Sequence, residues 1–366
     1  MNRRIYEFDQ IRVIAAISVI IIHVTAIYSS TSSFAYYSNQ LVRYAVPIFI
    51  LLSGFLLHFS NADRELSYLN FLSKRFKKIL IPYLVWSIIY ILFENRSNLS
   101  SVYYKSGFLV ESLTHIIRGT AYPHLYFVII IIQMYLLYPF LKVLLGKYPK
   151  ALISSSFLLT LFFQTAVYMS LLKAVHLPKF IIPYYIFFPT WLFYFIFGMY
   201  LSENTEKVKV RIKNNRIQLI ALWFAGLFIL LVDSRITGTG FSSIKPSTML
   251  YCLLSFFAFY SVLQRFQTDT PALRNTICWI SAQSYTLYLS HMLVLSLIIT
   301  FFRSFGLNSV LANNPGMVLL FLLTLALSLI FTYVISLTPF ATLFGGVGKK
   351  TPGIHSKIQG SHTTQL

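Results

Sequence analysis

The chain has 366 residues, of which 57% are hydrophobic and only 11% are charged, and its mean hydropathy is +0.69. These values exclude an ordinary soluble enzyme, because the apolar residues also form long blocks of the length that crosses a bilayer. The formal net charge of +20 does not indicate a nucleic-acid partner, since the sequence holds neither a basic patch interleaved with aromatic residues nor a nucleic-acid motif. The composition predicts an all-α, polytopic membrane protein.

Ten apolar stretches are predicted to span the membrane. In chain order they cover residues 10–28, 40–59, 78–94, 125–145, 151–171, 184–202, 216–233, 247–264, 277–302 and 317–338. Of the thirty Lys and Arg residues, twenty fall in the termini and the alternate loops assigned to the inside, eight fall in the outer loops, and Arg12 and Arg43 lie within spans. Because basic loops remain on the cytoplasmic side, both termini are predicted to be cytoplasmic, and odd-numbered spans run outward.

The first span contains two ionisable residues, Arg12 and His23. Such side chains cost on the order of several kcal/mol inside a bilayer unless they are paired or hydrated. Their eleven-residue separation returns both to one helix face, roughly 16 Å apart along the axis. We therefore expect both residues to face one cavity, with Arg12 near the inner edge and His23 further out.

Two further histidines are predicted at a similar depth. His124 opens the fourth span at its outer end, and His291 lies in the outer half of the ninth. Ser284 and Tyr288 precede His291 at the spacing that places all three on one helix face. A single intramembrane histidine is usually a packed residue bonded to a neighbouring helix, but three at similar depth favour a functional site.

A neutral imidazole can take a proton from an alcohol or can itself be acylated, and both roles suit acyl transfer to a hydroxyl group. The sequence contains no zinc-binding spacing, no Gly-x-Ser-x-Gly segment and no P-loop. We therefore predict neither a bound metal ion nor a bound cofactor. All ten acidic residues lie near span ends or in loops, which disfavours an ion-coupled pump, since such pumps commonly need a carboxylate in the middle of the membrane.

Arg75 and Lys78 belong to a basic stretch between Leu66 and Lys78 that suits a short helix on the inner leaflet. This surface could hold anionic lipid, or equally the phosphates of a donor such as coenzyme A. The outer connection from Asn95 to Pro123 is expected to be a surface loop, with a lid or an acceptor-binding segment as the alternative. The predicted organisation is one membrane domain over residues 1–345 and a disordered cytoplasmic tail over residues 346–366.

Several motifs resemble those of the acyltransferase-three family, integral membrane enzymes that O-acylate extracytoplasmic sugars and cell-wall glycans. The matching residues are Asp9, Arg12 and His23; Leu52-Ser53-Gly54-Phe55-Leu56; Arg75 to Tyr83; His124-Leu-Tyr126-Phe127; Phe197-Gly198-Met199; and Ser284 to His291. Two positions depart from the family pattern, because Tyr126 replaces a tryptophan and Lys78 stands where arginine is frequent. The chain is most similar to the short branch without a fused soluble domain that contains the intercellular adhesion protein C, whose members have been assigned either glycan acylation or glycan export.

The resemblance implies transfer of an acetyl or succinyl group from cytoplasmic acyl-coenzyme A to a hydroxyl of an extracytoplasmic glycan. Acyl-coenzyme A, in particular acetyl-coenzyme A, would be a co-substrate. The implied catalytic residues are His23 and Arg12, and Arg75 with Lys78 would bind the donor. Ser284, Tyr288, His291 and His124 would bind or orient the acceptor.

The expected location is the plasma membrane. The expected partners are membrane lipids, the glycan acceptor and glycan-synthesis proteins, with no nucleic acid. The alternative function is a polysaccharide or lipid-linked glycan exporter. A scaffold within a glycan-synthesis complex is a third hypothesis, but it leaves the intramembrane Arg12 and His23 unexplained.

Overall fold

The computed structural model describes residues 5–62, 67–97, 107–177, 183–240, 242–265 and 270–348, and over these ranges the chain is helical without a β-strand. The helices are α1 (Tyr6–Tyr28), α2 (Ser33–Leu41), α3 (Ala45–Asn61), α4 (Tyr68–Glu94), α6 (Phe108–Arg118), α7 (Tyr126–Lys147), α8 (Pro149–Leu171), α9 (Leu192–Glu203), α10 (Thr205–Asn214), α11 (Arg216–Thr237), α12 (Pro246–Leu263), α13 (Pro271–Ser304) and α14 (Asn314–Leu337), with short 3-10 helices η1 (Phe188–Thr190) and η2 (Asn308–Leu311). The predicted all-α class is confirmed for the described residues.

Within the described ranges, nine segments are long and apolar enough to cross a membrane, with α2 and α3 together forming one of them. The predicted sixth span, 184–202, differs from the other nine predictions. It consists of η1 followed by the 12-residue helix α9, and a helix of this length rises only about 18 Å. The count of ten full-length spans is therefore reduced to nine membrane-length segments and one short apolar helix.

The backbone before α9 is irregular, and side chains of other helices satisfy several of its polar groups. Gln133 on α7 donates from Nε2 to the carbonyl of Ile186 at 2.9 Å, and its Oε1 accepts from the backbone N–H of Phe188 at 3.1 Å. Thr160 on α8 donates to the carbonyl of Pro189 at 2.8 Å. Irregular backbone is tolerated at membrane depth only where protein partners replace water, and these two side chains supply them.

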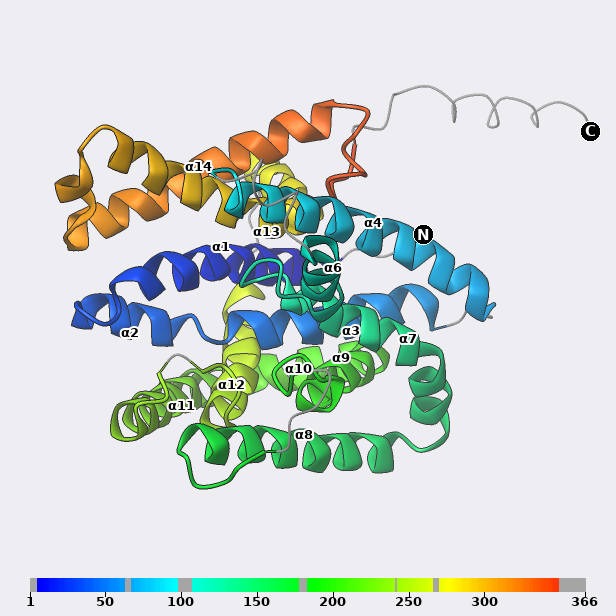
Figure 1. Cartoon of the computed structure of the whole chain (residues 1–366). Helices are drawn as coiled ribbons and strands as arrows, with labels where there is room; N and C mark the ends of the chain where they lie inside the picture. Colours follow the sequence, from blue (N-terminus) through cyan, green and yellow to red (C-terminus); the bar gives the residue numbers. More distant parts are fainter. Residues whose placement is uncertain are drawn as a thin grey trace, which may run out of the picture.

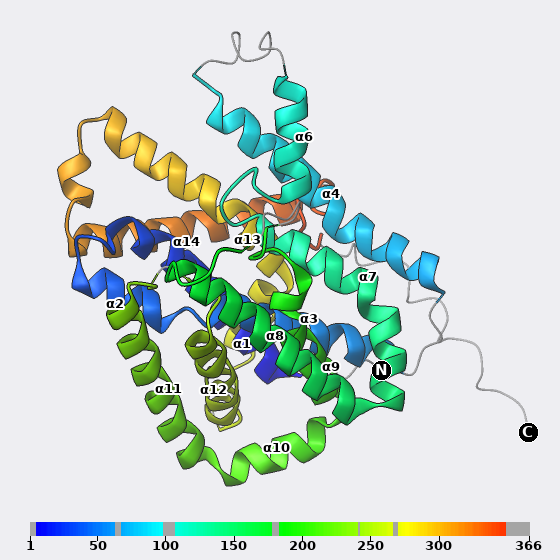
Figure 2. The ribbon, with the colours of Figure 1, turned by 60° about the horizontal axis from the view of Figure 1, so that its bottom comes forward.

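Two predicted connections also have more regular structure than expected. The basic stretch does not form a separate short helix: the described part of it, from Tyr68, is the first half of the continuous helix α4, although Leu66 lies outside the described residues. The outer connection contains helix α6, which packs beside α4 (Figure 2); residues 98–106 of this connection lie outside the described part.

The arrangement places α1 at the centre of the molecule. Figure 1 shows α1 and α3 in the middle, with α4, α13 and α14 on one side and α8, α11 and α12 on the other. Helix α1 packs against α2, α3, α12, α13 and α14. Its polar residues are therefore enclosed by protein, as the cost of exposing them to lipid requires.

Helices α3 and α9 approach so closely that only glycine fits at their contact. A Cβ atom on Gly54 would lie 2.1 Å from the carbonyl oxygen of Phe195, and one on Gly198 would lie 2.0 Å from that of Leu51. Small residues allow this backbone approach between membrane helices, where dispersion rather than hydrophobic burial drives association. Two motifs far apart in the sequence, Ser53-Gly54-Phe55 and Phe197-Gly198-Met199, thus form one helix contact.

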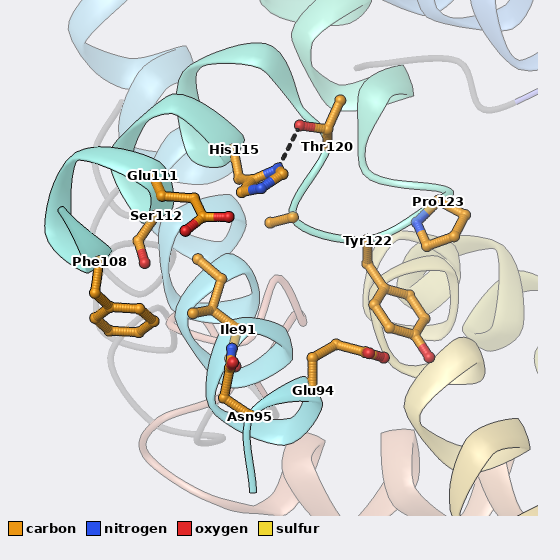
Figure 3. Close-up of a pocket in the computed structure, with 11 residues that line it drawn as sticks. Ile91, Glu94, Asn95, Phe108, Glu111, Ser112, His115, Thr120, Tyr122 and Pro123 are labelled. Atoms are coloured by element: carbon orange, nitrogen blue, oxygen red, sulfur yellow. Dashed lines mark hydrogen bonds between the residues drawn. The ribbon is translucent and has the colours of Figure 1, made fainter. Parts of the chain in front are cut away.

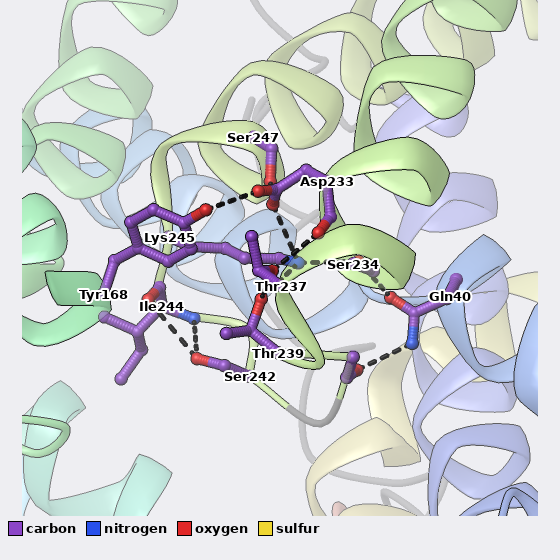
Figure 4. Close-up of polar contacts among 11 residues, drawn as sticks. Gln40, Tyr168, Asp233, Ser234, Thr237, Thr239, Ser242, Ile244, Lys245 and Ser247 are labelled. Atoms are coloured by element: carbon purple, nitrogen blue, oxygen red, sulfur yellow. Dashed lines mark hydrogen bonds and ion pairs between the residues drawn. The ribbon is translucent and has the colours of Figure 1, made fainter. Parts of the chain in front are cut away.

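A buried ion pair joins α11 to the residue preceding α12. The Nζ of Lys245, a residue with no exposed surface, lies 3.0 Å from the carboxylate of Asp233 and donates to Ser234 at 2.6 Å (Figure 4). The Asp233 carboxylate also accepts from Tyr168 at 2.6 Å and from Ser247 at 2.5 Å. Burial lowers the pKa of Lys245, while Asp233 acts in the opposite direction. The hydrogen bonds from Tyr168 and Ser247 to Asp233, and from Lys245 to Ser234, are what a buried ion pair needs to offset its desolvation.

Candidate functional site

Three histidines from distant parts of the chain meet around one point. His23 comes from α1, His124 from the connection immediately before α7, and His291 from α13. The distance between ring centroids is 5.3 Å for His23 and His291, 6.2 Å for His23 and His124, and 5.0 Å for His124 and His291. We call these three residues the histidine cluster. The ring of Tyr288 lies beside it, 5.2 Å from that of His124 and 6.0 Å from that of His291.

Hydrogen bonds to the backbone decide the tautomers of two of these rings. The Nδ1 of His291 lies 2.6 Å from the carbonyl oxygen of Tyr288, and the Nε2 of His124 lies 3.4 Å from that of Leu289. Because a carbonyl oxygen can only accept, each of these nitrogens carries the proton of the neutral ring. The other nitrogens, Nε2 of His291 and Nδ1 of His124, are buried and have no hydrogen-bond partner among the described residues. The cluster therefore presents two buried lone pairs that can accept protons.

Burial keeps at least one member of the cluster neutral. His124 lies outside the membrane-length helices, and burial lowers its pKa well below the ordinary value, with His291 and His23 acting in the same direction. Its position is fixed from several sides, since Tyr288 donates its hydroxyl proton to the carbonyl of His124 and the ring of Tyr90 lies 5.3 Å away. A neutral, oriented imidazole is the form required of a general base.

A cavity of about 950 Å³ leads from the basic residues of α4 to the edge of the cluster. Its wall includes Arg75, Lys77 and Lys78. Tyr288, which contacts His124 and His291, lines the same cavity. We call this space the basic cavity. Its volume lies within the range of roughly 300–1,000 Å³ found for small-molecule sites.

Arg12 lies on the wall of the basic cavity and also lines an adjoining space of about 540 Å³. Asp9, one helical turn earlier, lines the smaller space and accepts a hydrogen bond from Ser281 of α13 at 2.6 Å. This bond holds the N-terminal part of α1 against α13. The Asp-x-x-Arg spacing thus combines a carboxylate that fixes the helix with an arginine that reaches the cavity.

The segment after α14 closes one side of the basic cavity. Gly345, Gly346, Val347 and Gly348 line it. Gln283 of α13 holds this segment by two hydrogen bonds, since its Nε2 donates to the carbonyl of Val347 at 2.7 Å and its Oε1 accepts from the Val347 N–H at 2.9 Å. Residues 346–348 of the predicted tail therefore lie against α13 and the cavity, while residues 349–366 lie outside the described residues.

The structure separates the sequence-predicted residues into two groups. Arg12, Arg75 and Lys78 line the basic cavity, but so do Ser284 and Tyr288, which the sequence assigns to the acceptor. His23 lines neither the basic cavity nor the adjoining space; it lies in the cluster beyond Tyr288. Of the two residues expected to face one cavity, Arg12 lines both of these spaces, whereas His23 lies in the histidine cluster.

Sequence reasoning identifies Arg43 only as a second intramembrane arginine. In the structure it lies on the connection between α2 and α3, buried, close enough to His23 for an electrostatic interaction. It donates to the side-chain oxygen of Asn39, whose Nδ2 donates to the carbonyl of Ile22 at 2.9 Å and to Thr25 at 2.8 Å. The signal that could have identified it is the cost of a second arginine within a span.

The network of the buried ion pair holds the helix that carries Asn39. Ser234 donates to Oε1 of Gln40 at 3.0 Å, and Nε2 of Gln40 donates to the carbonyl of Gly240 at 2.6 Å (Figure 4). Lys245 and Asp233 therefore fix α2 against α11, and Asn39 fixes α2 against α1. In the described part of the chain, no group of three or more His, Cys, Asp or Glu side chains is placed to hold a metal ion.

These features define a polytopic helical membrane protein with an enclosed histidine cluster beside a basic cavity. A family model described as "Acyltransferase domain", of the acyltransferase-three type, matches residues 5–333. The chain therefore belongs to this acyltransferase family.

Two curated relatives carry the name "Probable poly-beta-1,6-N-acetyl-D-glucosamine export protein". The protein from Staphylococcus aureus is 27% identical over 282 residues, which cover 75% of each chain. The protein from Staphylococcus epidermidis is 27% identical over 322 residues, which cover 84% of this chain and 86% of the relative. No solved structure matches the chain.

Proposed function

We propose that this protein is an O-acyltransferase of the plasma membrane that moves an acetyl or succinyl group from cytoplasmic acyl-coenzyme A to a hydroxyl of an extracytoplasmic glycan. The observation that carries the proposal is the continuity of the basic cavity. One wall joins Arg75 and Lys78 to Tyr288, and Tyr288 contacts two rings of the histidine cluster. Family membership supports the reaction class.

The donor enters the basic cavity from the inner side, where basic loops indicate the cytoplasm. Its phosphates pair with Arg75, Lys77 and Lys78, which lie on the cavity wall, through charge-assisted hydrogen bonds. The pantetheine arm then extends along the cavity past Ser284 to Tyr288. This path brings the thioester to the cluster and gives Ser284 and Tyr288 a role on the donor side.

The acceptor hydroxyl reaches the cluster from the outer side. His23 is the member that is partly exposed, whereas His124 and His291 are buried, so we assign proton acceptance from the hydroxyl to His23. The hydroxyl oxygen attacks the thioester carbonyl, the bond to sulfur breaks, and the imidazolium returns the proton to the departing thiolate. His124 and His291 act as positioning residues: their neutral rings surround the ring of His23 and add no charge beside it.

Substitution of His23 by alanine tests this assignment. In membranes supplied with radiolabelled acetyl-coenzyme A, His23→Ala is expected to abolish labelling of the membrane-associated glycan without lowering the abundance of the protein. His176→Ala, at an exposed histidine outside the cluster, is the matched control and retains wild-type labelling. Undiminished labelling with His23→Ala would contradict the assigned role.

The names of the relatives favour a second candidate, polysaccharide export. A deletion strain distinguishes the two functions. An acyltransferase predicts a normal amount of surface glycan that lacks acyl groups, whereas an exporter predicts glycan retained inside the cell. Expression of His23→Ala in the deletion strain should not restore acylation of the glycan. If export of the glycan depends on its acylation, this variant should not restore export either.

A further inference from the structure

Helix α6 (Phe108–Arg118) has one strongly exposed apolar side. The helix has 11 residues, none of them buried, so it rises only about 16 Å and is too short to cross a bilayer. Four apolar side chains on it are 57–73% exposed: Leu109, Val110, Leu113 and Ile117. At about 100° per residue, these four positions fall within one sector of roughly 100° around the helix. We call these four residues the apolar face of α6.

A second side of α6 packs against the protein. Phe108 and Ser112 line a cavity of about 460 Å³ between α6, the C-terminal end of α4 and the connection to α7 (Figure 3). Ile116, one turn after Ser112, packs against the main core, and its carbonyl accepts a hydrogen bond from the hydroxyl of Tyr83 on α4. These contacts fix the rotation of α6 about its own axis, so the direction of the apolar face is fixed as well.

The third side of α6 is polar. Its residues, which lie across the helix from the apolar face, are Glu111, Thr114, His115 and Arg118. The helix thus turns one side to the protein, one apolar side outward and one polar side away from the apolar one. A short helix that lies at the boundary between a bilayer and water has this division, because its apolar side enters the lipid while its polar side stays among headgroups and water. In water alone, the apolar face would stay exposed at a cost.

The position of α6 in the chain places it at a membrane boundary. It follows α4, which ends at Glu94, and precedes α7, which begins at Tyr126, and both of these helices are of membrane length. Figure 2 shows α6 at the edge of the helix bundle, beside α4. Helix α4 itself has an exposed apolar stripe at helical spacing, 37–51% exposed, which consists of Ile81, Leu84, Ile88 and Leu92. Lipid that covers this stripe of a membrane-spanning helix also reaches α6.

We propose that α6 is an interfacial helix whose apolar face is embedded among the lipid acyl chains of the leaflet in which α4 ends and α7 begins. The occupant of the face is therefore the bilayer. The embedded helix also anchors the connection that carries His124. Gly119, which ends α6 with φ +66°, lies so close to α7 that an added Cβ would be 2.9 Å from the Cα of Tyr126.

Fluorescence from single sites of the purified full-length protein tests the proposal. Leu113→Cys and Ile117→Cys place a label on the apolar face, and Thr114→Cys and Arg118→Cys place it on the polar side. Each variant is labelled with bimane and reconstituted into nanodiscs of phosphatidylcholine, with or without bromine on the acyl chains. We expect brominated lipid to lower the fluorescence of the two apolar-face labels at least about twofold, because they lie among acyl chains, and to leave the two polar-side labels nearly unchanged.

The controls use the same chemistry. All variants carry Cys278→Ser, and the remaining cysteine, Cys252, has no exposed surface that a label could reach. Ile88→Cys, on the exposed stripe of α4, is the positive control and should be quenched by brominated lipid. Thermal unfolding in the same nanodiscs verifies that each labelled variant is folded.

Three results would overturn the proposal. Equal quenching on both sides of α6 would show that the helix has no fixed orientation to the bilayer. Apolar-face labels with blue-shifted emission but no quenching would show that protein, such as a second copy of this chain, covers the face. Unquenched labels with the emission of bimane in water would place the face in water. None of these measurements depends on whether the protein transfers acyl groups or exports glycan.

Discussion

The imidazole rings of His124 and His291 lie with their centroids 5.0 Å apart, and each donates a different nitrogen to a backbone carbonyl. The two remaining nitrogens are both buried lone pairs. This arrangement fixes the orientation of two neutral rings before any substrate arrives. Preorganised polar groups of this kind lose little free energy to reorganisation during a reaction.

Replacement of His291 by glutamine is expected to lower acyl transfer by about 10²-fold, the cost of misplacing a reacting group by roughly 1 Å, because the ring of His291 lies 5.3 Å from that of His23. Glutamine retains a donor for the Tyr288 carbonyl but cannot supply an imidazole lone pair. The measurement is initial rate of labelled acetyl transfer between pH 5 and 9. A positioning role predicts a changed pH profile as well as a lower rate, with unchanged protein abundance; a reduction below tenfold with the wild-type profile would contradict it.

Removal of Arg75 should weaken donor binding more than catalysis. Its guanidinium lies 5.8 Å from the ring centroids of Phe71 and Tyr135, which keeps the side chain at the cavity wall. Loss of one charge-assisted hydrogen bond costs about 1.5–3 kcal/mol, so Arg75→Ala should raise KM for acyl-coenzyme A roughly ten- to a hundredfold with a smaller change in kcat. Lys150→Ala, at an exposed basic residue away from the cavity, should leave both constants unchanged. A fall in kcat with an unchanged KM would place Arg75 in the chemistry instead.

A methyl group at the contact between α3 and α9 should destabilise the protein. A Cβ atom on Gly54 or Gly198 would clash with a backbone oxygen, and the clash can be relieved only if a helix moves. Overpacking of this kind costs about 1–3 kcal/mol. Gly54→Ala and Gly198→Ala should therefore lower the unfolding temperature of the purified protein. Gly146 on α7 has no heavy atom within 4 Å of its added Cβ, so Gly146→Ala is a control that leaves stability unchanged or slightly raised. Equal unfolding temperatures for all three variants would contradict this packing.

The segment held by Gln283 should be needed for donor affinity. Gln283→Ala removes both hydrogen bonds to Val347, and truncation after Gly345 removes part of the cavity wall. Each change should weaken binding of acyl-coenzyme A, measured by titration calorimetry. Truncation after Gly348 keeps the wall and should preserve wild-type affinity. Equal loss in both truncations would assign the effect to the residues beyond Gly348.

The sequence by itself determined the class of protein, because the bilayer imposes long apolar segments and penalises every ionisable group within them. Those two rules identify the membrane-length segments of the described ranges and select Arg12, His23 and His291 as exceptional residues. The motifs around Gly54 and Gly198 are visible in the sequence as well. The reason for these two glycines is not visible there, because local periodicity does not show which two helices pack against each other.

Only the tertiary structure decided which exceptional residues lie together. His23, His124 and His291 meet because α13 and the start of α7 pack around α1, and no spacing along the chain encodes that contact. The shortening of the sixth span likewise depends on Gln133 and Thr160, which satisfy its irregular backbone from other helices. Polar groups in a membrane interior must find protein partners, and the identity of those partners is fixed by packing between segments that are distant in the sequence.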